Sequence, residues 1–129
     1  MSSERWKRIL RVRQVQERMQ QSSVADEARA VAAARDEVER RQARLDAVVE
    51  EDHLHDPLMA EISARFRAQI KEKVTEGEDA HAKAKESHRL ALAELMNAHR
   101  DRKSVERIHE RAAEREPPLT MTHPAPFPA

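Results

Sequence analysis

The first 56 residues of this 129-residue chain contain neither glycine nor proline, the two residues that most readily interrupt a helix. After Pro57 the only glycine is Gly77, and the next proline is Pro117. Residues that favour helix, namely Ala, Glu, Arg, Lys and Gln, are abundant, whereas only 2% of the residues are the aromatic ones that strands prefer. The sequence therefore predicts an all-α protein.

Asp56 and Pro57 predict the start of a second helix, because aspartate caps free backbone N–H groups and proline suits the first helical position. We expect a helix over 3–52, a turn over 53–56 and a helix over 57–115. Two helices of similar length with a short connection fold back on each other, which predicts an antiparallel coiled-coil hairpin over 1–116. Residues 117–129 hold five prolines and are predicted to form a disordered tail.

Apolar residues recur at helical spacing in both predicted helices, so that each has one apolar face that it cannot bury alone. In the first helix the spacing is seven residues, as in a left-handed coiled coil. The predicted seam consists of Val24, Val31, Val38, Leu45, Ile62, Phe66, Ile70, Leu95 and Val105.

The seam of the first helix is expected to be interrupted once. Val12, Val15 and Met19 follow a three-four rhythm, but the step from Met19 to Val24 is five residues, which predicts a local discontinuity there. A turn centred near residue 55 would place Val31 near Ala80.

The segment EEDHLHDP, residues 50 to 57, combines acids with two histidines and is the most metal-like stretch. In a helix, however, the side chains of His53 and His55 diverge by about 200°, whereas the usual helical metal pair is three or four residues apart. His99 and the other histidines of the second helix are isolated from one another. We therefore expect a solvated acidic tip and no metal site.

Sequence features of a catalytic centre are absent as well. There is no cysteine, no glycine-rich phosphate loop and no nucleophile elbow, and a helical hairpin has no deep cleft in which a base could be desolvated. We expect no enzymatic activity, no cofactor and no small-molecule substrate. The chain also lacks an apolar run of the roughly 18 residues that a membrane span needs, which predicts a cytoplasmic protein.

Charge is unevenly distributed, although 24 basic residues balance 24 acidic ones. Residues 1–18 hold six Lys or Arg against two Glu, and residues 98–115 hold six Lys or Arg against four acidic residues. Residues 46–61, by contrast, hold acidic residues and no Lys or Arg. The basic end of the hairpin predicts binding to an acidic protein face. Nucleic acid is a weaker alternative, because Trp6 is the only aromatic residue among these bases, and a merely solvated face is a third.

Two segments resemble a known family. RWKRILRVRQVQERMQQ, residues 5–21, and NAHRDRKSVERIHERAAE, residues 97–114, are similar to the terminal segments of the FliJ and YscO group of type III secretion stalk proteins. The chain length and the two-helix organisation also fit that group.

The resemblance implies a non-enzymatic stalk or adaptor of the flagellar or a related export apparatus. Its basic end would enter the hexameric export ATPase, and the rest would meet the export gate protein or export chaperones at the cytoplasmic face of the membrane. The residues implied to face the ATPase, with Trp6 holding the two helices together, are Arg5, Trp6, Arg8, Arg11, Arg13, Arg102, Lys103 and Arg107. An unrelated coiled-coil scaffold and a nucleic-acid-binding helical protein remain as alternatives.

Overall fold

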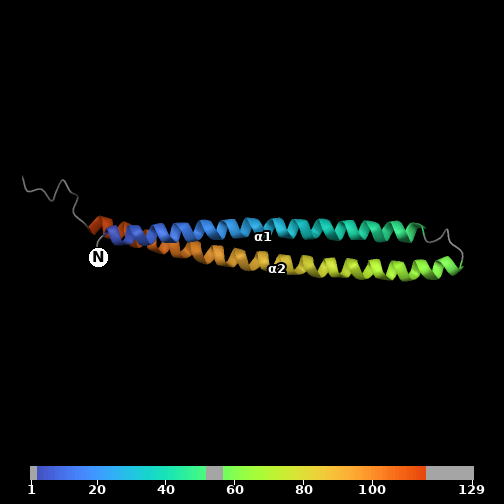
Figure 1. The fold of residues 1–129 in the computed structure, drawn as a ribbon. Helices are drawn as coiled ribbons and strands as arrows, with labels where there is room; N and C mark the ends of the chain where they lie inside the picture. Colours follow the sequence, from blue (N-terminus) through green and yellow to red (C-terminus); the bar gives the residue numbers. More distant parts are fainter. Residues whose placement is uncertain (1–2, 52–56, 116–129) are drawn as a thin grey trace, which may run out of the picture. The chain divides into compact units, whose positions relative to one another are not determined.

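A computed structural model describes residues 3–51 and 57–115 of the chain, and these form two helices without a strand among them. Helix α1 spans Ser3–Glu51 and helix α2 spans Pro57–Arg115 (Figure 1). The two helices pack against each other in opposite directions, which confirms the predicted all-α antiparallel hairpin. The predicted turn and tail, residues 53–56 and 117–129, lie outside the described residues.

The local sequence accounts for both helices. No residue of α1 breaks the backbone hydrogen-bond pattern, and α2 begins with Pro57, whose missing N–H costs nothing at a first helical position. Gly77 does not interrupt α2, and its φ is not positive. The Asp56 cap lies outside the described residues.

The chain divides into two compact units, and the first combines Met1–Ser22 with Ala93–Ala129. Its described part pairs the start of α1, blue in Figure 1, with the end of α2, orange to red. Arg13 of α1 lies near Asp101 of α2, and Glu17 lies near His99. The residue numbers along α2 therefore fall as those along α1 rise. This order shows that the helices are antiparallel in this unit.

The second unit, Ser23–Leu92, also pairs a part of α1 with a part of α2. Arg41 of α1 contacts the backbone of Lys73, and Val38 lies against Gly77. Ile70 and Val74 of α2 are its most buried apolar residues, only 4% and 5% exposed.

Two predicted seam residues are wrong. Ile62 and Phe66 are 55% and 43% exposed. The less exposed positions preceding Ile70 are Ser63 and Arg67, one residue further along α2. One residue is about 100° around a helix, enough to move a side chain from the centre of the interface to its exposed edge, where the ring of Phe66 faces Arg44 of α1. The remaining seam residues are buried (Ile70 and Val105) or half-buried (Val24, Val31, Val38, Leu45 and Leu95).

The predicted discontinuity between Met19 and Val24 is also wrong. Helix α1 is continuous, and between Leu10 and Val24 the least exposed positions recur at three-four spacing as Arg13, Glu17 and Gln20. The five-residue step in the apolar pattern arises because Val12, Val15 and Met19 point to solvent. A polar interface replaces the apolar one at this level of α1.

The helix register differs from the one expected for a turn centred at residue 55. That centre would pair Val38 with residue 72, but Val38 lies against Gly77, and Ala80, the expected neighbour of Val31, is exposed. Register is set by the side chains that interdigitate, and the absent side chain of Gly77 makes room for Val38 and Arg41.

Candidate protein-interaction surface

A buried carboxylate joins the two helices of the first unit. Glu17 of α1 is only 9% exposed. Its Oε1 lies 2.9 Å from Nδ1 of His99, and its Oε2 accepts a hydrogen bond from Nε of Arg102. Arg102 also donates to Glu106, one turn further along α2. The charge of Glu17 is therefore compensated from α2, as a buried charge requires.

These contacts favour the ionised form of Glu17. The hydrogen bond with His99 is the main cause that holds the pKa of Glu17 below its ordinary value of 4.5. Arg102 lowers this pKa further, and together the two residues outweigh the opposite effect of burial. His99 was expected to be isolated; that expectation considered only other histidines and overlooked a carboxylate from the other helix.

Two of the residues predicted to face a partner are engaged inside the unit. The side chain of Arg102 is 20% exposed and its guanidinium is bonded to Glu17 and Glu106. Arg13 donates to Gln16 and lies 3.8 Å from Asp101 of α2. Arg102 is thus a residue of the helix interface and not of the free surface, which corrects its predicted role, and Arg13 is half-buried beside it.

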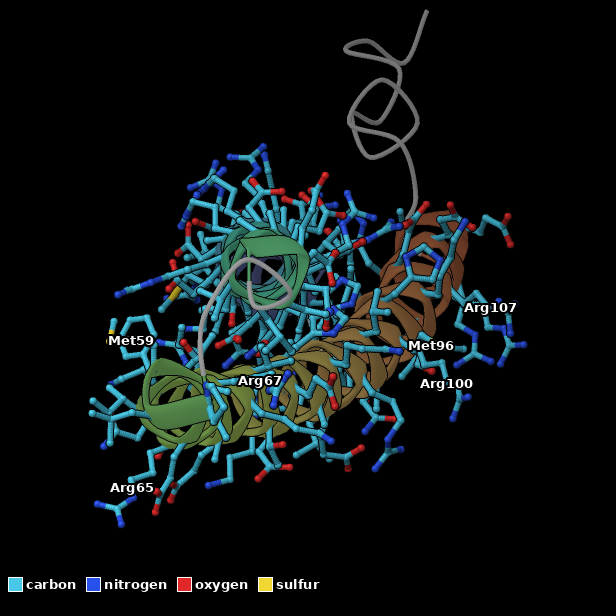
Figure 2. All side chains as sticks on the ribbon, turned by 90° about the vertical axis from the view of Figure 1, so that its right-hand side faces the viewer. Met59, Arg65, Arg67, Met96, Arg100 and Arg107 are labelled. Atoms are coloured by element: carbon cyan, nitrogen blue, oxygen red, sulfur yellow. The ribbon has the colours of Figure 1, made fainter. Side chains whose placement is uncertain are left out.

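The other predicted cations are exposed, and within the described part of the chain none of them forms an ion pair. They are Arg5, Arg8 and Arg11 of α1 and Lys103 and Arg107 of α2. Trp6 is half-buried. Figure 2 shows Arg107 on the same side of α2 as Arg100, with both side chains directed away from the helix.

The described part of the first unit is strongly basic. Residues 3–22 and 93–115 hold 12 Lys or Arg against 7 Asp or Glu. Because Glu17 and Glu106 are engaged by Arg102, the surface is more basic than these totals indicate. An acidic partner surface is the complement of such a charge distribution.

A groove of about 420 Å³ runs beside the Glu17 cluster. Its lining residues are Glu17, Gln21, Leu95, Met96, His99 and Arg100. Its only carboxylate and imidazole are bonded to each other, and no serine, threonine or lysine lines it. The groove offers apolar area, mainly from Leu95 and Met96, beside an exposed arginine.

The second unit has a polar contact of its own, which the sequence patterns did not predict. Arg41 donates from Nε to Glu37 at 2.9 Å and from Nη1 to the carbonyl oxygen of Lys73 at 2.7 Å. A Cβ atom at Gly77 would lie 3.4 Å from Arg41 Nη1. One feature of the sequence could have indicated this contact. Gly77 follows Val74 by three residues and Ile70 by seven, so it lies on the same face of α2 as these two apolar residues.

No group of three or more metal-ligating side chains occurs within 3–51 and 57–115, and the His53–His55 pair lies outside these ranges. In α1 and α2 no segment combines the length and hydropathy that a membrane crossing requires.

No family model, curated protein or solved structure matches this chain.

Proposed function

We propose that this chain is a non-enzymatic stalk or adaptor of a flagellar or related type III export apparatus, similar to the FliJ and YscO group. In this role its basic end binds the hexameric export ATPase. The rest of the chain contacts the export gate protein or export chaperones, so that the protein is peripheral at the cytoplasmic face of the membrane.

The observation that supports this proposal most is the first unit itself. The segments 5–21 and 97–114, far apart in the sequence, belong to one compact unit and are joined by the Glu17–Arg102 ion pair. A partner can therefore contact both segments at once. The buried ion pair fixes their register, while the exposed cations remain available for acidic groups.

The proposed contact residues are the exposed ones of the predicted set, Arg5, Arg8, Arg11, Lys103 and Arg107. Exposed Arg and Lys side chains steer an acidic partner and raise its association rate, an effect that salt weakens. Arg102 has a different role, because it holds α1 and α2 together.

The direct test is binding of the full chain to the cognate export ATPase, with ATP turnover measured with and without it. Arg5→Glu combined with Arg107→Glu changes one exposed cation on each helix and is expected to reduce binding and stimulation at least tenfold. Lys83→Glu combined with Lys85→Glu is the matched control, since both lysines are exposed and lie in the second unit.

Equal losses in both double variants would show that net charge matters and not the basic end. An unrelated coiled-coil scaffold predicts that the wild-type chain neither binds nor stimulates the ATPase, and that result would end the stalk proposal.

A further inference from the structure

Three apolar side chains of α1 are exposed side by side in the first unit. Val12, Val15 and Met19 are 55%, 52% and 66% exposed. Their spacing of three and four residues places them on one face of the helix, opposite the half-buried and buried positions Arg13 and Glu17. This face extends over two helical turns, in contrast to the single exposed apolar residues that are common on any protein surface.

Cations lie beside this apolar face and at its N-terminal end. Arg11 and Arg18 lie four residues before and three residues after Val15, so both are its neighbours on the helix surface. Arg8 continues the row one turn toward the N-terminus, and all three arginines are exposed. We call Val12, Val15 and Met19, with Arg8, Arg11 and Arg18, the outer strip.

The outer strip contains no acid. Between Arg5 and Ala25 the only acidic residue of α1 is Glu17. Its carboxylate is directed to the opposite side, where it is bonded to His99 and Arg102. The positive charge of the strip is therefore not neutralised along α1 itself.

The apolar row and the arginines beside it together indicate which kind of partner the outer strip can bind. A helix with apolar residues at three-four spacing packs on an apolar row of the same spacing, and acidic residues beside that row would pair with Arg11 and Arg18. A second copy that presented its own outer strip would bring three more arginines against these three, and like charges oppose this pairing.

We propose that the outer strip docks an acidic amphipathic helix of a partner protein, which packs on α1 as a third helix. The outer strip shares Arg8 and Arg11 with the contact proposed for the export ATPase, but its apolar row of Val12, Val15 and Met19 has no part in that contact, and docking of a helix on it does not depend on that function.

The test uses a synthetic amphipathic peptide of about three heptads, with leucine at the three-four positions and glutamate beside them, labelled for fluorescence anisotropy. A second peptide has lysine in place of each glutamate. The full chain is expected to bind the acidic peptide and not the basic one.

Two pairs of substitutions assign the binding to the strip. Val15→Gln with Met19→Gln is expected to weaken binding of the acidic peptide about tenfold, or about 1.4 kcal/mol. Leu90→Gln with Leu92→Gln, at two leucines of the second unit that are 50% and 40% exposed, is the matched control and is expected to change nothing. Arg11→Glu with Arg18→Glu is expected to abolish binding of the acidic peptide and to allow binding of the basic one.

Folding is checked in the same variants by circular dichroism. Glutamine favours helix at least as well as valine, and the replaced side chains are exposed, so helicity and melting temperature should stay at wild-type values.

Several results would overturn the proposal. Equal binding of both peptides, or an equal loss in Leu90→Gln with Leu92→Gln, would show that the strip does not recognise the acidic helix. Self-association of the wild type, lost in Val15→Gln with Met19→Gln, would assign the strip to a second copy. Binding to phosphatidylserine vesicles that the same variant loses, without binding of the acidic peptide, would assign it to a lipid surface. Because no ATPase is present in these assays, their outcome is independent of the export proposal.

Discussion

Gly77 is the position at which the structure makes the sharpest stability prediction. Glycine in a helix interior is less favourable than alanine by about 1 kcal/mol. Gly77 lies inside α2 without a positive φ, so alanine fits its backbone without strain. A Cβ atom there would meet Val38 Cγ2 and Arg41 Nη1 at 3.4 Å and Arg41 Cδ at 3.5 Å, which are distances of van der Waals contact. We therefore expect Gly77→Ala to stabilise the chain by about 1 kcal/mol.

The opposing effect at this site is the hydrogen bond from Arg41 to the carbonyl oxygen of Lys73, 2.7 Å long. Such a bond contributes about 1 kcal/mol, so its complete loss would cancel the gain. The close atoms belong mainly to a long, flexible side chain and already lie at van der Waals distance from the new Cβ, so we expect the bond to be kept. Gly77→Leu, whose further carbons need the space of Val38 and Arg41, should instead cost about 1 to 3 kcal/mol.

Thermal unfolding followed by circular dichroism measures these differences. One kcal/mol corresponds to a rise of about 4 °C in melting temperature for a chain of this size. Thr75→Ala is the control, because Thr75 is exposed two residues away and alanine there gains about 0.5 kcal/mol of helix propensity without entering the interface. If Gly77→Ala melts below the wild type while Thr75→Ala melts above it, the space at Gly77 has been misjudged. If the loss persists in an Arg41→Ala background, Arg41 is not the obstacle.

Two further predictions concern acid and the apolar core. Since the pKa of Glu17 is lowered on folding, ionised Glu17 stabilises the chain above pH 4.5, and this contribution is lost as pH falls through the lowered value. The melting temperature of the wild type should therefore fall more between pH 7 and about pH 3 than that of Glu17→Gln, and parallel curves would contradict the role of His99 and Arg102. Ile70→Ala should cost about 2 to 4 kcal/mol and Ile62→Ala less than about 0.5, because the two isoleucines are 4% and 55% exposed. Equal losses in urea unfolding would show that the register of α2 is not the one described.

The candidate surface could be predicted only in part from the sequence. A basic end was predicted correctly from composition, since exposed cations are visible as a run of Arg and Lys. The sequence did not show which of these cations are exposed, because Arg102 is engaged by a carboxylate 85 positions away along the chain. The same contact explains why His99 was not predicted to have a partner on the other helix.

The sequence by itself determined where the chain is helical. Helix formation depends on local properties, such as the absence of breakers before Pro57, and these are present within a few residues of each position. The predicted start and end of α2 at Pro57 and Arg115 depend on nothing further away.

Only the tertiary structure decided which face of each helix is turned inward. Val12 and Val15 are more apolar than Arg13 and Glu17, yet they are the ones exposed. The inner face of α1 is chosen by what α2 presents to it, namely His99 and Arg102 in the first unit and Gly77 in the second. A helix of this composition has more than one face at seven-residue spacing, and the energies that distinguish them arise only when two helices meet.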